Sequence, residues 1–261
     1  MTAVARLLAH TWWMIGRQLR NLMREPIWIA LILIQPMIWL LLYGQLFKRV
    51  IQIPGFHATS YVAFLTPGIV IMNAFFSASW SGMAMIEDLD RRVIERFLAT
   101  PASRLSLVLS QVVRAAMTSA FQALVILLVG LALGAHVTTG AVGWIAVLCT
   151  GALVGMAFGG FSHGLALIVR QEASMIGIAN FIGLPLLFLS STLQAPGLIP
   201  HWMQQVTRFN PVNWGVVAAR IPFLPHPDWA QFWIHLGLLA ALAIVSCAFA
   251  TRAFRVYQRS L

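Results

Sequence analysis

The chain has 261 residues, of which 60% are hydrophobic and only 9% are charged, and its mean hydropathy is +0.84. This composition is far more apolar than that of soluble domains, so it argues against a soluble enzyme or a soluble binding module. The net charge of +10 favours contact with anionic membrane lipids. We expect no nucleic-acid partner, because no basic patch lies in a soluble module.

The segment before the first apolar run predicts an amphipathic helix over residues 3–25. At about 100° per residue, Trp12 and several aliphatic residues fall on one side, and Arg17, Arg20 and Arg24 fall on the other. Such a helix lies in the inner membrane interface, with its arginines toward the lipid phosphates. A soluble cytoplasmic helix is the alternative, but it would leave Trp12 in water.

Six apolar runs are each long enough to cross a bilayer as a helix, which takes about 20 residues. They cover residues 27–47, 61–86, 105–133, 141–169, 173–194 and 230–250. The sequence therefore predicts an all-α integral membrane protein, with six transmembrane helices in a single domain. The first run begins too deep in the chain for a cleaved signal peptide.

The basic residues predict the orientation in the membrane. Of the 17, only Lys48, Arg49, Arg208 and Arg220 fall in segments expected outside. The others gather at the opposite side, so the positive-inside rule places both termini and the loop at 87–104 in the cytoplasm. We expect a multi-pass protein of the cell (cytoplasmic) membrane.

A short cytoplasmic helix is predicted over residues 87–100, between the second and third runs. Its apolar residues Leu89, Val93 and Phe97 recur every four positions. Charged residues cover the rest of the surface: Glu87, Asp88, Asp90, Arg91, Arg92, Glu95 and Arg96. The apolar stripe favours docking in a groove of another protein over a merely solvated turn, and the charges would then set the register.

Two short helices are predicted in the outer segment 199–221. Pro200 and Pro211 suit first helical positions, and Asn210 suits the cap of the second helix. Each helix carries an apolar stripe, formed by Trp202, Val206 and Phe209 and by Trp214, Val217 and Ile221. The stripes favour a pair that dips into the outer leaflet over an exposed surface loop.

Polar residues within the runs are few and neutral. A possible substrate path consists of Asn73, Phe76, Ser77, Gln122, Asn180 and Ser190. Its amide, hydroxyl and aromatic groups suit an amphipathic drug or a lipid better than a densely hydroxylated glycan. The alternative is that these side chains only hold helices together.

The sequence gives little support for a catalytic or proton-transfer site within the membrane. No run holds an acid apart from the end residues Glu87 and Glu172, which disfavours a proton-coupled carrier or a membrane-embedded enzyme. We expect His163, which has glycine neighbours, to pack helices, and Cys149 and Cys247 to be buried soft residues without a metal.

Four motifs together resemble the membrane subunit of type-2 ABC exporters, the permeases of daunorubicin-resistance-type pumps and of polysaccharide and teichoic acid exporters. They are REPIWIALILIQPMIWLLLYG (24–44), YVAFLTPGIVIM (61–72), DLDRRVIERFLATPASR (88–104) and LIPHWMQQVTRFNPVNWGVVAAR (198–220). The last two are the most specific. The chain departs from the family at Arg92, where glycine is usual.

This resemblance implies a six-span permease that pairs with a second copy or a close homologue and with two cytoplasmic ATPase subunits. The helix at 87–100 would couple to the ATPase, the N-terminal helix would lie in the interface, and the outer pair would roof the exit as a gate. The chain lacks a G-x-x-x-x-G-K-[ST] phosphate loop, so we expect it not to be an enzyme and to carry no cofactor; the partner binds ATP and Mg.

The expected function is export of a hydrophobic or amphipathic drug or a lipid-like substrate. The same permease class exporting a lipid-linked polysaccharide or teichoic acid is one alternative. A secondary carrier or a membrane-embedded enzyme is the alternative of another class.

Overall fold

The computed structural model describes residues 26–46, 60–91, 104–193 and 200–259, and these ranges are helical with no strand. The predicted interfacial helix, with Trp12, Arg17, Arg20 and Arg24, lies outside the described residues, as does most of the predicted helix at 87–100. The helices are α2 (Pro26–Leu46), α3 (Tyr61–Trp80), α4 (Gly82–Asp90), α6 (Arg104–Ala132), α7 (Gly140–Val169), α8 (Glu172–Phe188), α9 (His201–Phe209), α10 (Pro211–Arg220), the 3-10 helix η3 (Ile221–Phe223) and α11 (Trp229–Arg259).

Four stretches within the described residues are long and apolar enough to cross a membrane: Tyr61–Asp90, Val108–Ala132, Gly140–Val169 and Trp229–Gln258. The helix α2 has 21 residues and α8 has 17. A helix of 17 residues spans about 26 Å, a little less than the hydrocarbon core of a bilayer. The chain is therefore a multi-pass membrane protein with four clear spans and two further apolar helices.

The helix α8 ends earlier than the apolar run predicts. The run extends to residue 194, but the helix stops at Phe188. Pro185 lies in its last turn, and the Ser190 hydroxyl donates to the Leu187 carbonyl at 2.6 Å, so a side chain satisfies the helix end. At the other extreme, α11 continues to Arg259, nine residues beyond the predicted end.

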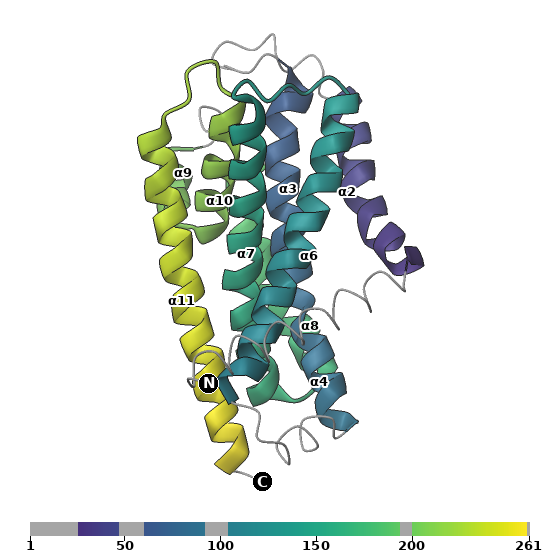
Figure 1. Cartoon of the computed structure of the whole chain (residues 1–261), viewed down its shortest axis with the longest axis vertical. Helices are drawn as coiled ribbons and strands as arrows, with labels where there is room; N and C mark the ends of the chain where they lie inside the picture. The colour runs from purple at the N-terminus through teal and green to yellow at the C-terminus, as the bar shows by residue number, and fades with distance from the viewer. Residues whose placement is uncertain (1–25, 47–59, 92–103, 194–199, 260–261) are drawn as a thin grey trace, which may run out of the picture.

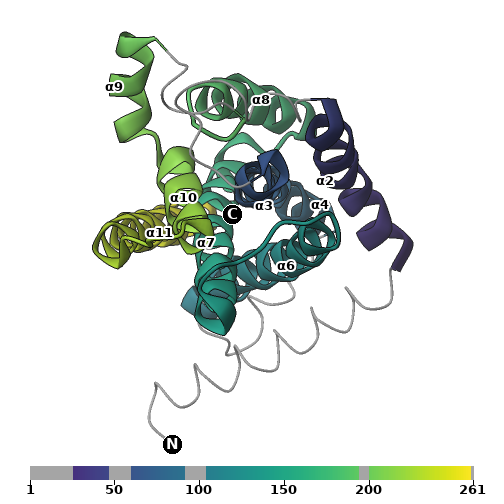
Figure 2. The ribbon, with the colours of Figure 1, turned by 90° about the horizontal axis from the view of Figure 1, so that it is seen from above.

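The helix α7 is the centre of the bundle, and α3, α6, α10 and α11 pack around it (Figures 1 and 2). Glycines make this close packing possible. A Cβ atom on Gly155 would lie 2.5 Å from the Ser119 hydroxyl oxygen of α6, and one on Gly164 would lie 2.6 Å from the Phe249 ring of α11. Small residues at helix contacts are typical of membrane proteins, because they let backbones approach.

The second predicted span is broken at Ser81, between α3 and α4. The Ser162 hydroxyl of α7 enters the break, where it donates to the Ser79 carbonyl and accepts from the Gly82 amide at 3.0 Å. A side chain inserted into the backbone ladder is a known cause of helix kinks. This break separates the part of the span within the bundle core from the short helix that leads to residue 91.

Burial differs strongly between the spans. The stretch containing α3 is the most buried of the four, and α11 is the least buried. Cys149 was expected to be buried but is exposed, and Cys247 is only partly buried. The reason is that the bilayer-facing surface of a membrane protein is as apolar as its core, so an apolar position need not lie inside.

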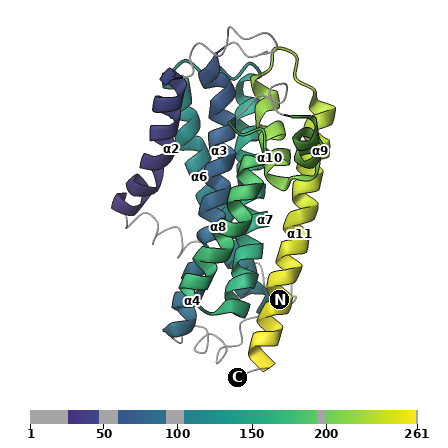
Figure 3. The same ribbon diagram turned by 180° about the vertical axis from the view of Figure 1, so that it is seen from behind.

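The described helix ends that flank the predicted inside segments and those that flank the predicted outside segments lie at opposite ends of the bundle (Figures 1 and 3). The end of α4, the turn at Arg170 and the C-terminal end of α11 share one end, which we call the α4 end. The turn between α6 and α7 and the start of α11 lie at the other, the α10 end. There the Thr138 hydroxyl donates to the Pro222 carbonyl at 2.9 Å, which joins the α6–α7 turn to η3.

Candidate transport site

The corner between α9 and α10 is held by Asn210. Its side-chain oxygen accepts from the Val212 amide at 2.9 Å and so caps α10, whose first residue is Pro211. This confirms the predicted cap. Pro200 was predicted at the first position of its helix, but it is the N-cap of α9, whose first residue is His201. The Asn210 amide nitrogen also donates to the carbonyls of Leu186 and Leu189, at 2.6 and 2.7 Å. One side chain thus fixes both the start of α10 and the end of α8.

Arg220 ends α10 and reaches the turn that follows α8. Its Nη2 donates to the Ser191 carbonyl at 2.8 Å, and its guanidinium carbon lies 3.8 Å from the centre of the Phe64 ring of α3. Asn213, one turn into α10, accepts from both the amide and the hydroxyl of Ser191, at 3.0 and 2.6 Å. Two residues of α10 therefore clamp the 190–192 turn against α3.

On the α3 side, the 190–192 turn packs against Gly68. A Cβ atom on Gly68 would lie 2.4 Å from the Thr192 carbonyl oxygen, so no larger residue fits there without a shift. Ser190 is buried, and its hydroxyl and that of Thr192 are 2.6 Å apart. Ser190, predicted on the substrate path, is thus a structural part of this turn.

The two predicted apolar stripes have different surroundings. On α9, Trp202 is 62% exposed and Phe209 is 81% exposed, so this stripe faces away from the bundle. On α10, Trp214 packs against the main core, and its indole nitrogen donates to the Arg208 carbonyl at 2.7 Å. The helix α10 is therefore part of the protein core, whereas the aromatic side chains of α9 are exposed on the surface of the molecule.

Asn73 and Gln122 meet between α3 and α6. The Asn73 amide donates to the Gln122 side-chain oxygen at 3.0 Å, and Gln122 is buried. Phe76 packs against the main core, while Ser77 and Asn180 are partly buried on α3 and α8. The hydrogen bond of the pair is a helix contact, and a role of these side chains on a substrate path stays a prediction.

The start of the predicted coupling segment is the last turn of α4. Glu87 and Arg91 form an ion pair of 2.6 Å, in which both side chains are largely exposed. Leu89 packs against an apolar cluster of the chain itself, and Asp90 is exposed. The remaining predicted residues, Arg92, Val93, Glu95, Arg96 and Phe97, lie outside the described residues, and Asp88 is partly buried on the same turn.

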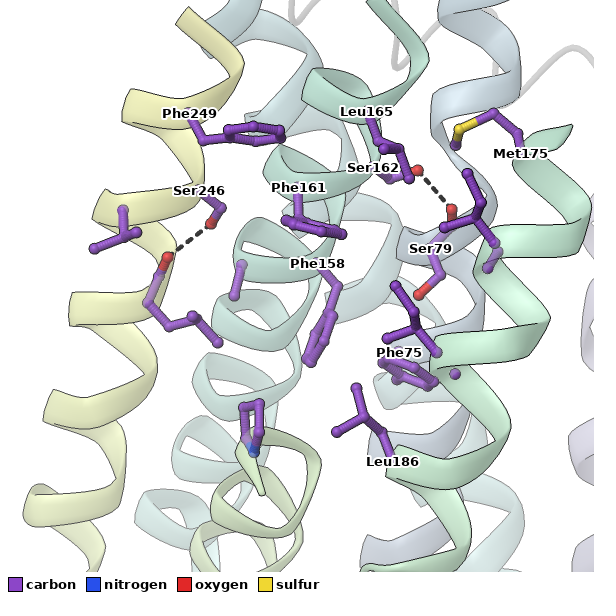
Figure 4. A pocket seen from close by; sticks show the side chains of 18 residues that line it. Phe75, Ser79, Phe158, Phe161, Ser162, Leu165, Met175, Leu186, Ser246 and Phe249 are labelled. Atoms are coloured by element: carbon purple, nitrogen blue, oxygen red, sulfur yellow. Dashed lines mark hydrogen bonds between the residues drawn. The ribbon is translucent and has the colours of Figure 1, made fainter. Parts of the chain in front are cut away.

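An apolar cavity of about 410 Å³ lies midway along the bundle between α7, α8 and α11, with α3 behind it (Figure 4). Its wall combines aliphatic side chains with four phenylalanine rings. Phe75 and Phe158 meet edge to face with ring centres 4.6 Å apart, and Phe161 stacks on Phe249 at 5.5 Å. None of the six residues named for the substrate path lines this cavity, but Phe75 and Ser79, which the sequence also places among the inward-facing groups of the second span, do.

Comparison with known proteins decides the family. The model of the ABC-2 type transporter family matches residues 9–224. The chain belongs to the ABC-2 type transporter family. It is the membrane permease subunit of an ABC transporter, and its family works with an ABC ATPase subunit.

Relatives of this ABC-2 permease agree with that assignment. The daunorubicin resistance ABC transporter permease protein of Streptomyces coeruleorubidus is 26% identical over 269 aligned positions, which cover 98% of this chain and 87% of the relative. A putative transport permease of Cyanophora paradoxa is 27% identical over 217 positions, covering 83% and 74%. A putative transport permease of Pyropia yezoensis is 28% identical over 212 positions, covering 79% and 71%.

Several residues of this ABC-2 permease that build the site escaped the sequence analysis. They are Asn213 and Thr192 at the clamp and Ser162 at the break of the second span. The sequence carries a weak signal for Ser162. The segments SASWSG (77–82) and GGFSHG (159–164) are both rich in small and hydroxylated residues, which favour close helix contacts. Only the tertiary structure shows that these two segments face each other.

Proposed function

We propose that this ABC-2 permease exports a hydrophobic or amphipathic compound, drug-like or lipid-like, with energy from a separate ATPase. The observation that carries the proposal is the match along 98% of the chain to a permease named for daunorubicin resistance. The apolar wall of the cavity is compatible with a substrate that has a large hydrocarbon part, because small-molecule sites are concave and mostly apolar.

The proposed topology has six spans with both termini in the cytoplasm. The four clear spans are joined by α2 and α8, each of which crosses the membrane once. The α4 end carries the exposed Arg91, Arg252 and Arg255, and an excess of basic residues is typical of the cytoplasmic side. The N-terminal segment would then lie on anionic lipid at that side.

The proposed transporter contains two permeases, identical or closely similar, and two ATPase subunits that bind ATP and Mg. The helix at 87–100 docks on an ATPase, and it begins in the last turn of α4. Closure of the ATPases would therefore move α4, and the break at Ser81 is where this movement meets the buried part of the span. The α9–α10 pair forms the outer gate, which Arg220 and Asn213 hold in place.

The test is to purify the tagged chain from its own organism and to identify what comes with it by mass spectrometry. We expect an ABC ATPase, ATP hydrolysis by the complex and none by the separated chain. Inside-out vesicles that hold the complex should accumulate daunorubicin when given ATP and Mg. Robust hydrolysis by the permease alone would contradict the assignment, and stimulation only by a lipid-linked glycan would replace the drug-like substrate class.

A further inference from the structure

The cavity between α7, α8 and α11 has the features of a ligand site. Its volume of about 410 Å³ falls within the roughly 300–1,000 Å³ of small-molecule sites. Side chains from α3, α7, α8 and α11 converge on it, as Figure 4 shows for Phe75, Phe158, Met175 and Phe249. It lies within the membrane-spanning part of the bundle, beside the stretches that cross the bilayer.

Three serines line the wall, and the hydroxyls of two of them are bonded to backbone carbonyls. The Ser162 hydroxyl donates to the Ser79 carbonyl, and the Ser246 hydroxyl donates to the Leu242 carbonyl at 2.7 Å. No charged side chain lines the described cavity. The Ser79 hydroxyl is the one polar side-chain group left in the wall, so a polar ligand would lose most of its hydrogen bonds to water and the wall selects for hydrocarbon.

The cavity opens sideways, between α8 and α11. The helix α8 packs on α3, α4, α7 and α10, but its contact with α11 is slight. Phe161, Ile182 and Val245 line the cavity and are also exposed, so they form its rim. Because these helices stand in the bilayer, the rim faces lipid acyl chains.

We propose that this cavity binds an acyl chain of a bilayer lipid. A chain can enter through the rim without leaving the hydrocarbon, and it replaces an empty apolar void with contacts to four phenylalanine rings. A helix of a second permease copy laid over the rim is the alternative occupant, and the disulfide experiment below tests for it. The bound chain also contacts Ser79 and Ser162, on the two sides of the α3–α7 contact at the helix break.

The experiment reconstitutes the full-length permease in nanodiscs of phosphatidylethanolamine and phosphatidylglycerol. A small fraction of the phosphatidylethanolamine carries a photoactivatable diazirine in the middle of one acyl chain. After illumination, mass spectrometry maps the labelled residues. We expect labels concentrated on cavity residues of α7, α8 and α11, well above the level at other bilayer-facing positions.

Four variants make the result specific. Ala179→Trp and Leu242→Trp each put a large ring into the cavity, from α8 and from α11. Phe181→Trp and Ile244→Trp, at exposed positions of the same two helices, are the matched controls. Each filling variant should lower cavity labelling about tenfold, which corresponds to the contacts of about two methylene groups, and the controls should leave it unchanged.

Two outcomes would overturn the proposal. One is labelling of the cavity no stronger than that of the exposed faces of α2 and α11, or equally strong in the filled variants. The other is efficient disulfide formation between two copies through cysteines placed at Ile182 and Val245, which would show that protein covers the rim. Size-exclusion profiles of all four variants test whether a loss of label is a loss of folding. As a second check, Ala179→Trp on α8 and Leu242→Trp on α11 must both lower the labelling.

Discussion

The Ser162 hydroxyl of α7 accepts a hydrogen bond of 3.0 Å from the Gly82 amide, at the point where the helical ladder between α3 and α4 is interrupted. The same hydroxyl donates to the Ser79 carbonyl. One side chain thus takes the place of the backbone partners that the break removes. It ties α4 to α7, the central helix of the bundle.

Removing this hydroxyl should destabilise the permease. Ser162→Ala leaves a buried amide and a buried carbonyl without partners, which costs about 1–3 kcal/mol. Ser174→Ala, which removes a hydroxyl at the exposed start of α8, should stay within about 0.5 kcal/mol of wild type. Thermal unfolding of the purified proteins in one detergent measures the difference. Equal melting temperatures for both variants would show that the Ser162 bridge contributes nothing.

The close approach at Gly82 gives a second prediction. A Cβ atom there would lie 2.5 Å from the Ser162 carbonyl oxygen, so Gly82→Ala must push α4 away from α7 and should cost about 1–3 kcal/mol. Gly177 on α8 has nothing within 4 Å of such a Cβ atom, and Gly177→Ala should be neutral or stabilise by up to about 1 kcal/mol. Melting temperatures that move in the same direction would refute the close contact between α4 and α7.

A double-mutant cycle can decide whether Asn73 and Gln122 form a helix contact or lie on the substrate path. Asn73→Leu alone leaves the buried Gln122 amide without its partner and should cost about 1–3 kcal/mol, whereas Asn73→Leu with Gln122→Leu should recover most of that loss. We expect the double variant to transport normally, as a helix contact requires. A double variant that is stable but fails to transport would place both residues on the substrate path.

Arg220 should resist even a conservative exchange. Arg220→Lys keeps the charge but loses the planar group that both stacks on Phe64 and reaches the 190–192 turn, so we expect a loss of about 1–3 kcal/mol and slower transport. Arg208→Lys, on the short outer helix α9, is the matched control and should change neither. Transport rates in vesicles, normalised to the amount of folded permease, test this; equal rates would mean that the clamp does not depend on the guanidinium.

The coupling segment makes the last prediction. Phe97→Ala removes an aromatic anchor and should weaken ATPase binding by about 2 kcal/mol or more, while Glu95→Lys should weaken it mainly at low salt. Asp228→Asn removes an exposed charge at the α10 end, keeps a side-chain oxygen for the start of α11, and should leave ATPase binding intact. Pull-down of the ATPase at two salt concentrations, with efflux measured alongside, separates the three. Normal binding and efflux in Phe97→Ala would contradict the coupling helix.

Much of the α9–α10 element could be predicted because its signals are local. An asparagine followed by proline sets a helix cap and a first turn with few alternatives, and Asn210 and Pro211 take those positions. The partners of Arg220 could not be predicted in the same way. They lie on α3 and after α8, far away in the chain, and only the packing of α10 brings them within hydrogen-bond distance.

The sequence by itself determined the class of the protein, the position of its long apolar helices and the family, because length, hydropathy and motifs are properties of contiguous residues. Only the tertiary structure decided which apolar residues face the core and which face the bilayer, since a membrane gives both surfaces the same composition. It also decided that Ser162 completes the broken ladder at Gly82 and that four phenylalanines enclose a cavity. These features depend on how separate helices pack, and the pattern of residues within one helix does not indicate which other helix packs against it.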